Sequence, residues 1–306
     1  MDLWQLQVFC KVVEEKSFSR AGKRIHLSQP TISSHIKDLE AHFGCRLIDR
    51  LSKQAVPTQA GELLYAYARK LILLKQEAES AMAGFMGKMK GTLAVGGSTI
   101  PGGYILPGTI AKFTKAYPQI RISLSIADTE DITQAILSGV IEMGIVGAQA
   151  RNKKLLQERL IDDDMRLIVP KGHPWASKRS VTLGMLRSEP FVSREPGSGT
   201  LRSIELSLNR KGFSLADLNI GLQMGNTVSV IQAVKGGAGV SILSTVAVQE
   251  DIEAGTLSAL EVEGVDLVRS FYLTRLKHRS ISPIGQAFVD FLKETYRLNA
   301  GASTDR

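Results

Sequence analysis

Residues 193–200 read SREPGSGT, and their residue types suit the binding of a small charged group. Two glycines let the backbone approach a ligand closely, and three hydroxyl groups supply hydrogen-bond donors. The segment is also placed to begin a helix, whose first N–H groups favour an anion. Two interpretations follow: the loop cradles a phosphate in an enzyme, or it holds a small anion that the protein only senses.

Motifs for catalysis are missing from the sequence. It has no Walker A loop, no G-x-S-x-G elbow and no HExxH motif. His35, His42 and Cys45 are the one grouping that resembles a metal site, but the two histidines lie nearly two helical turns apart and no fourth ligand is near. We therefore expect no catalytic residue, no metal and no cofactor, and we expect that the protein is not an enzyme.

Composition indicates a globular protein of two or three domains. The chain has 306 residues, of which 43% are hydrophobic. No stretch approaches the roughly 20 apolar residues that a membrane span requires. The N-terminus, MDLWQLQVFC, lacks the pattern of a signal peptide, and two cysteines provide no disulfide framework. We expect a cytoplasmic protein.

Positive charge is concentrated in the first third of the sequence. The formal net charge is +8, and residues 1–90 contain 14 Lys or Arg against 9 Asp or Glu. Eight of these basic residues fall between Lys16 and Lys53, where three acidic residues occur. A basic patch of this kind is typical of nucleic-acid-binding modules, although a solvated basic face has the same composition.

Short helices are predicted in the first 43 residues. Apolar residues at helical spacing predict a helix over 2–15 with Cys10 in the core, and Ser17 can cap a second helix over 18–25. Ser28 can cap a third helix, in which Pro30 is tolerated because it lies in the first turn. The apolar stripe of this third helix is expected to pack against the first two helices: Ile32, Ile36, Leu39 and Phe43.

The opposite face of the third helix carries short hydrogen-bonding side chains ahead of a lysine. When the N-terminal half of such a helix enters a major groove, Gln and Ser reach base edges and Lys reaches phosphate. A surface helix with ordinary polar residues is the alternative, and the helix-turn-helix spacing and basic surroundings favour DNA. The candidate DNA contacts on and before this helix are Ser28, Gln29, Pro30, Thr31, Ser33, Ser34 and Lys37.

Residues 17–50, SFSRAGKRIHLSQPTISSHIKDLEAHFGCRLIDR, resemble the N-terminal winged helix-turn-helix of LysR-type transcriptional regulators. The triplet at 28–30, the run at 36–40 and the pair at 43–44 carry the resemblance, which continues across the rest of the chain. It implies that residues 50–57 form the wing, with Arg50 and Lys53 on backbone phosphates.

The chain departs from the family pattern at two places. Gly22 stands where the family usually has alanine, which costs about 1 kcal/mol of helix propensity. Ser34 and His35 replace the more usual Arg and Gln, so the base preference of typical members does not transfer.

A long helix is predicted from residue 58 to about 86. Its apolar residues alternate spacings of three and four, which is typical of a coiled-coil seam and favours dimerisation over packing on its own domain. Two copies imply a pseudo-palindromic operator, and the family resemblance implies a homotetramer. The seam comprises Leu64, Tyr67, Leu71, Leu74, Ala78, Ala81 and Phe85.

After Gly91 short apolar strands alternate with helices, which is typical of an α/β sheet. Strands are predicted at 92–97, 120–127, 142–146, 165–169, 191–193, 220–224, 240–243 and 268–274. Helices are predicted at 102–116, 129–138, 198–211, 226–235 and 283–296. The resemblance implies a two-lobed effector domain like periplasmic binding proteins, with chain crossings near 162–164 and 266–270.

The predicted fold is therefore an N-terminal all-α winged helix-turn-helix with a long linker helix, followed by a two-lobed α/β effector domain. We place the DNA-binding domain at 1–57, the linker at 58–90 and the effector domain at 91–298, with a flexible tail at 299–306. Lobe I covers about 91–162 and 268–298, and lobe II covers about 163–267.

Loops at the carboxyl ends of strands are the candidate effector site, because helix N-termini there point donors outward. The loops at 96–99, 193–200 and 225–227 each combine hydroxyls with glycine. Helix capping alone explains any single loop, whereas three loops facing one cleft favour a site. The candidate residues are Ser98, Thr99, Gly147, Ser193, Ser198, Gly199, Thr200, Asn226 and Thr227.

The leading hypothesis is a sequence-specific DNA-binding transcriptional regulator that responds to a small anionic effector. SREPGSGT is similar to the matching loop of members that regulate sulfur assimilation or carbon fixation, which suggests a sulfate-like anion or a small phosphorylated metabolite. Glu195 beside such an anion requires a partner, for which Arg202 is the candidate. RNA polymerase is a candidate partner. The alternative is a solute-binding or transferase-like protein with an N-terminal dimerisation arm.

Overall fold

The computed structural model describes residues 1–51, 54–85, 89–150 and 152–302. The chain divides into two compact units. The first contains Met1–Gly91 and Ser138–Val140, and the second contains Thr92–Leu137 and the residues from Ile141 onward. None of the helices in the described ranges is both long enough and apolar enough to cross a membrane.

The first unit begins with α1 (Leu3–Glu15), α2 (Phe18–Ile25) and α3 (Gln29–Phe43). Ser17 and Ser28 cap α2 and α3 as predicted, since their hydroxyls accept hydrogen bonds from the N–H groups of Arg20 and Thr31. Cys10 is in the core, where burial raises the pKa of its thiol to about 12. The sequence therefore predicts these helices and their starts correctly.

The apolar stripe of α3 is confirmed at three positions and wrong at the fourth. Ile32, Ile36 and Leu39 are fully buried in the core of the first unit. Phe43 is 42% exposed. It lies at the end of α3, and its ring packs edge-on against His42 of the same turn.

A two-stranded hairpin follows, formed by β1 (Ile48–Leu51) and β2 (Gln54–Pro57) in antiparallel register. The Glu40 carboxylate of α3 accepts hydrogen bonds from the N–H groups of Leu47 (2.9 Å) and Ile48 (3.2 Å), which ties the hairpin to α3. Lys53 lies outside the described residues. Arg50 lies in β1, and its side chain is outside the described part.

Gly22 is held in close contact with the turn that follows α2. A Cβ at this position would lie 2.5 Å from the carbonyl oxygen of Leu27. Gly22→Ala is therefore expected to lower the free energy of unfolding by about 1–3 kcal/mol through overpacking, although alanine is the better helix former. Gly108→Ala is the matched control, because nothing lies within 4 Å of a Cβ there. Thermal unfolding measures both, and a variant at Gly22 as stable as the parent chain would contradict the close contact.

The long helix α4 (Gln59–Phe85) presents an open apolar face. Tyr67, Leu71 and Leu74 are 58%, 41% and 59% exposed. Ala78 is also exposed. Leu64, which the sequence places in the seam, packs instead against the core of its own unit, and neighbouring Leu63 is exposed. The side chains of Ala81 and Phe85 lie outside the described part of the chain.

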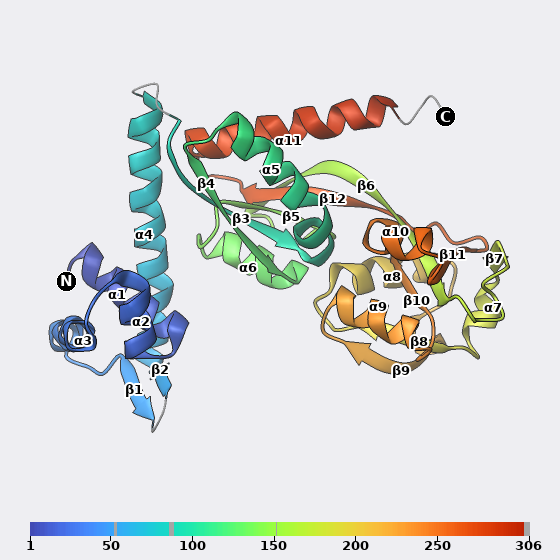
Figure 1. Cartoon of the computed structure of the whole chain (residues 1–306), viewed down its shortest axis with the longest axis horizontal. Helices are drawn as coiled ribbons and strands as arrows, with labels where there is room; N and C mark the ends of the chain where they lie inside the picture. The colour runs from blue at the N-terminus through green and yellow to red at the C-terminus, as the bar shows by residue number, and fades with distance from the viewer. Residues whose placement is uncertain (52–53, 86–88, 151, 303–306) are drawn as a thin grey trace. The chain divides into compact units, whose positions relative to one another are not determined.

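An eight-stranded sheet organises the second unit. Its order is β4-β3-β5-β12-β6-β11-β7, with β10 also paired to β6. Helices α5 and α11 pack together through Phe113 and Phe288 on one face, and α6 covers the other (Figure 1). The strands are β3 (Gly91–Ser98), β4 (Ile120–Ala127), β5 (Met143–Val146), β6 (Leu155–Pro170), β7 (Ser180–Val181), β10 (Ser241–Ser244), β11 (Leu257–Val262) and β12 (Val268–Leu276).

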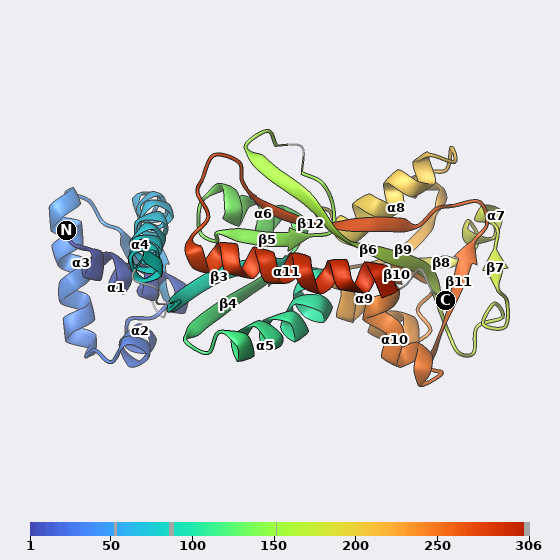
Figure 2. The ribbon, with the colours of Figure 1, turned by 90° about the horizontal axis from the view of Figure 1, so that it is seen from above.

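Strands β6 and β12 run antiparallel from one half of this unit into the other (Figure 2). Arg269 pairs with Asp163 in their register, so both predicted crossings lie side by side in one ribbon. Strand β6 begins at Leu155 and is longer than the predicted strand at 165–169, because pairing with β12 extends it through a charged segment.

The half beyond the ribbon contains β8 (Pro190–Arg194) and β9 (Asn219–Met224) as a parallel pair. Its core is built around Phe191, Leu208 and Ile242. The sequence gives no prediction for β7, β11, α7 or α10. The helices of the unit are α5 (Leu106–Ala116), α6 (Thr129–Leu137), α7 (Leu183–Leu186), α8 (Gly199–Asn209), α9 (Thr227–Lys235), α10 (Thr245–Glu253) and α11 (Pro283–Ala302).

Two segments differ from the predicted helices. The predicted helix at 102–116 is split, because Pro101–Ile105 forms a π-helical turn before α5. Helix α11 continues past the predicted end at Tyr296 and includes Asn299, which the sequence assigns to a flexible tail. Residues 303–306 lie outside the described residues.

Candidate functional site

The exposed face of α3 carries the residues that the sequence assigns to DNA contacts. Ser33 is half-buried, and the other assigned residues of this segment are exposed. The Gln29 Oε1 atom accepts a hydrogen bond from the Ser19 hydroxyl (3.0 Å), which leaves the amide N–H groups of Gln29 directed elsewhere. The exposed residues are Ser28, Gln29, Pro30, Thr31, Ser34 and Lys37.

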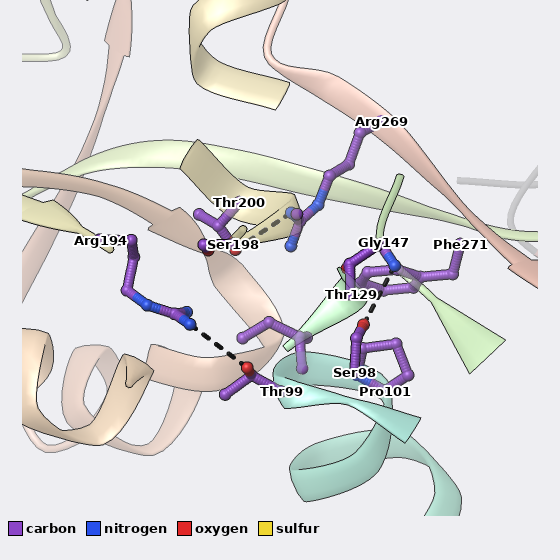
Figure 3. A pocket seen from close by; sticks show the side chains of 12 residues that line it. Ser98, Thr99, Pro101, Thr129, Gly147, Arg194, Ser198, Thr200, Arg269 and Phe271 are labelled. Atoms are coloured by element: carbon purple, nitrogen blue, oxygen red, sulfur yellow. Dashed lines mark hydrogen bonds between the residues drawn. The ribbon is translucent and has the colours of Figure 1, made fainter. Parts of the chain in front are cut away.

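A small pocket lies within the second unit, between the half built on β3 and the half built on β8 (Figure 3). The open space inside it is about 10 Å³, which is roughly the size of one water molecule. It is lined by Ser98, Thr99, Ile100, Pro101, Thr129, Gly147, Arg194, Ser198, Gly199, Thr200, Arg269 and Phe271.

Most of the candidate effector residues line this pocket, and three do not. The Ser193 hydroxyl donates to the carbonyl oxygen of Arg194 (3.1 Å), so it is engaged within its own strand. Asn226 caps α9 by accepting a hydrogen bond from the N–H group of Ser229 (2.8 Å). Thr227 Oγ1 accepts a hydrogen bond from Arg194 Nη1 and so helps to fix the position of that side chain, which lines the pocket. The candidates that line the pocket are Ser98, Thr99, Gly147, Ser198, Gly199 and Thr200.

Arg269 on β12 brings a buried positive charge to the pocket. Its Nε donates to Asp163 Oδ2 (2.7 Å) and its Nη1 donates to Thr200 Oγ1 (3.1 Å). Burial lowers the pKa of Arg269, and the charge of Asp163 opposes that shift. The Nη2 atom is buried and has no hydrogen-bond partner among the described residues. The Nη2 edge of this buried guanidinium is therefore available to donate a hydrogen bond to a ligand.

Arg194, the last residue of β8, brings a second guanidinium group (Figure 3). It is 3% exposed and makes two hydrogen bonds with the Glu195 carboxylate, at 2.7 and 2.6 Å. Its Nη1 donates to Thr227 Oγ1 (2.7 Å), and its Nη2 donates to Thr99 Oγ1 (3.3 Å) in the other half. The partner of Glu195 is therefore Arg194, and the suggestion of Arg202 is wrong.

Thr129 and Gly199 approach each other closely across the pocket. The Thr129 Oγ1 atom is buried without a hydrogen-bond partner in the described part of the chain. A Cβ on Gly199 would lie 2.5 Å from that atom, so glycine is required here. The unpaired Thr129 hydroxyl and the unpaired Arg269 Nη2 belong to residues that line the same pocket, so two buried polar groups there lack a hydrogen-bond partner among the described residues.

Arg194, Arg269 and Thr129 were not predicted as site residues from the sequence. Arg194 lies inside SREPGSGT, but its role depends on Thr99 and Thr227, which are distant in the chain. Arg269 carried a weaker signal, since it is a charged residue between the buried side chains of Leu267 and Phe271. A charge in such a position requires a partner, and that partner is Asp163.

Comparison with known proteins identifies the family of the chain. Residues 3–62 match the bacterial regulatory helix-turn-helix protein model of the lysR family, and residues 87–297 match the LysR substrate binding domain. The chain belongs to the LysR family of transcriptional regulators, with a DNA-binding module and an effector-binding domain. The alternative of a solute-binding or transferase-like protein is therefore wrong.

Relatives and solved structures agree with this assignment. The chain is 32% identical over 301 residues to the RuBisCO operon transcriptional regulator of Allochromatium vinosum, covering 98% of each chain. It is 28% identical to the HTH-type transcriptional regulator CysL of Bacillus subtilis, covering 95% of this chain and 97% of the relative. The regulatory domain of Synechocystis CcmR in complex with 2-PG is 25% identical with a TM-score of 0.62, covering 67% of this chain and 97% of that chain. Full-length CbnR complexed with its target DNA has the same fold, at 22% identity and a TM-score of 0.73, covering 96% of this chain and all of that chain (100%).

Proposed function

We propose that this regulator responds to a small oxyanion bound in the pocket between Thr129 and Arg269. The observation that carries the proposal is the pair of buried, unpaired polar atoms, Arg269 Nη2 and Thr129 Oγ1. A buried polar group without a partner costs about 1–3 kcal/mol, and an anion that accepts hydrogen bonds from both removes that cost. The Synechocystis regulatory domain in complex with 2-PG supports a small anionic ligand by analogy.

The ion pairs beside the pocket leave hydrogen-bond donors, and little net charge, to bind the ligand. Asp163 and Glu195 each neutralise one arginine, so the pocket has little net positive charge. The remaining donors are the Ser98, Thr129 and Thr200 hydroxyls and the first N–H groups of α8, which is capped by Ser198. Sulfate, sulfite and small phosphorylated acids match these donors in the hydrogen bonds that they accept, and the open space of about 10 Å³ must widen to admit any of them.

Effector binding would act through the two halves that supply the pocket. Thr99 and Thr129 come from one half, whereas Arg194 and Thr200 come from the other. A ligand that contacts both halves binds more tightly to the relative arrangement of the halves in which all of its contacts are made. This difference in affinity between arrangements is what a conformational response requires. The proposed lobes keep the boundaries predicted from the sequence, near 162–163 and 267–268.

The exposed residues of α3, together with Arg50 and Lys53, are the proposed DNA contacts, and the exposed face of α4 is the proposed dimer interface. This arrangement supports a homodimer, with a tetramer as the larger assembly, on a pseudo-palindromic operator. We place the protein in the cytoplasm, where it would act on DNA alone or with RNA polymerase, without catalysis.

Thr129→Val is the variant that tests the oxyanion pocket. Valine keeps the shape of the side chain and removes its unpaired hydroxyl, so the unliganded protein is expected to be as stable as the parent or up to about 1 kcal/mol more stable. Affinity for the anion is expected to fall by roughly tenfold, because one hydrogen bond to a charged ligand is lost.

Thermal unfolding of the full chain with sulfate, sulfite, phosphate or small phosphorylated acids measures both effects, with chloride at matched ionic strength as the control. A ligand at 100 times its Kd stabilises the native state by about 2.7 kcal/mol. The proposal fails when none of these anions raises the melting temperature above that in chloride, or when the valine variant responds as strongly as the parent.

A further inference from the structure

A second, larger groove lies alongside α8. It is bounded by residues 147–150, by one face of α8 and by the start of β12, and its volume is about 420 Å³. That volume is within the range of small-molecule sites. The groove shares Gly147 and Arg269 with the oxyanion pocket, and its other lining residues are different.

The charge of this groove is strongly one-sided. Arg202, Arg210 and Arg269 line it, and none of the lining residues in the described part of the chain is an aspartate or a glutamate. Arg269 is paired with Asp163, whereas the guanidinium groups of Arg202 and Arg210 make no ion pair or side-chain hydrogen bond within the described ranges. Two free arginines on one wall of a concave site attract an anion.

The Ser207 hydroxyl offers a further donor in the groove. Ser207 lines the groove between the two arginines, and its hydroxyl has no hydrogen-bond partner among the residues that the structure describes. The hydroxyl oxygen is not among the fully buried unpaired atoms, so it is open to the groove. It can therefore donate a hydrogen bond to a ligand that the two guanidinium groups hold.

The spacing of the arginines indicates the shape of the ligand. Arg202 and Arg210 are eight residues apart on α8 and at its C-cap, which separates their Cα atoms by about 12 Å along the helix axis. Long side chains that leave the helix at these two points can each reach one end of the same molecule, which favours a ligand with an acidic group at each end. Between them, Leu206 and Val268 are exposed and Tyr272 is half-buried, so the middle of the groove suits an apolar body.

We propose that the groove of Arg202, Arg210 and Ser207 binds an organic anion with two acidic groups, of the dicarboxylate class. The inference does not depend on the oxyanion pocket. Because Arg269 lines both sites, occupancy of the groove is expected to change the affinity of the pocket, and the reciprocal change follows by linkage.

Equilibrium dialysis of the full chain against radiolabelled glutarate tests the proposal, with succinate and adipate as competitors of other lengths and acetate as the competitor with one acidic group. We expect saturable binding of glutarate that a dicarboxylate displaces and acetate does not. Arg202→Gln with Arg210→Gln should weaken binding by at least about tenfold for each guanidinium lost. Because neither side chain has a partner, the melting temperature of the double variant should match that of the parent.

Matched variants separate the possible outcomes. Lys112→Gln with Lys115→Gln removes the same charge from the exposed side of α5 and should leave glutarate binding unchanged. Thr129→Val should also bind glutarate normally, so failure of the oxyanion pocket and failure of the groove are distinguishable. Equal glutarate binding by the double arginine variant, or no binding of any of the three dicarboxylates, would overturn the proposal. A change in the sedimentation of the arginine variant without dicarboxylate binding would assign the groove to contact between copies and would also overturn it.

Discussion

Asp163→Asn is expected to lower the free energy of unfolding of the second unit by about 3–5 kcal/mol. The Asp163 side chain is fully buried, and its two oxygens accept hydrogen bonds from Arg269 Nε (2.7 Å) and the Ser244 hydroxyl (2.6 Å). Asparagine preserves the size of the side chain and removes its charge. Arg269 would then remain as a buried cation without a counter-ion, and an uncompensated buried charge is strongly destabilising.

A double variant shows whether the charge is the cause. Asp163→Leu combined with Arg269→Met removes both charges and is expected to be less destabilising than Asp163→Asn alone, because no unpaired charge remains. Chemical denaturation of the full chain measures both variants. A chain carrying Asp163→Asn that unfolds at the same denaturant concentration as the parent would show that the ion pair contributes little.

Leu74→Glu is expected to weaken DNA binding by about 100-fold or more, although Leu74 is not a proposed DNA contact. The residue is 59% exposed in the middle of the apolar face of α4. Glutamate there would place charges inside the proposed dimer interface and separate the two copies. Two linked DNA modules gain a factor of about 100 to 10,000 from effective concentration, and separated modules lose it.

Gel-shift titration against the DNA upstream of the gene measures the loss, and sedimentation equilibrium measures the dimer. Ala66→Glu is the control, since Ala66 is exposed on the same helix but off the apolar face. If the Leu74 variant is a monomer and still binds DNA with the affinity of the parent, then DNA binding does not depend on dimerisation. If the Leu74 variant remains a dimer, then the dimer interface lies on a surface other than the apolar face of α4.

Local chemistry explains which parts of the fold could be predicted. Ser17 and Ser28 cap helices within three residues, and the buried stripe of α3 repeats within one helix, so the sequence contains both signals. The long helix α4 was predicted for the same reason. Leu64 was assigned to the seam, and in the structure it packs partly against the core of its own unit, because spacing alone does not distinguish a dimer seam from the edge of the domain's own core.

The missing parts depend on contacts between distant residues. Asp163 and Arg269 are 106 positions apart, and Arg194 and Thr99 are 95 positions apart, so neither pair has a signature in a local window. The first part of β6 carries charged side chains without a strand-like alternation, and its conformation is imposed by pairing with β12. SREPGSGT was predicted to bind an anion, while the arginine inside it was overlooked because its contacts with Thr99 and Thr227 join residues far apart in the chain.

The ribbon of β6 and β12 also limits how the two halves can move. Its ladder continues past Asp163 and Arg269, and its register shifts between Phe271 and Tyr272, two residues beyond the arginine. A bulge at this point increases local twist without ending the pairing. Motions of the halves that preserve the ladder must twist or bend this ribbon, so the two strands that join the halves also carry the guanidinium proposed to sense the ligand.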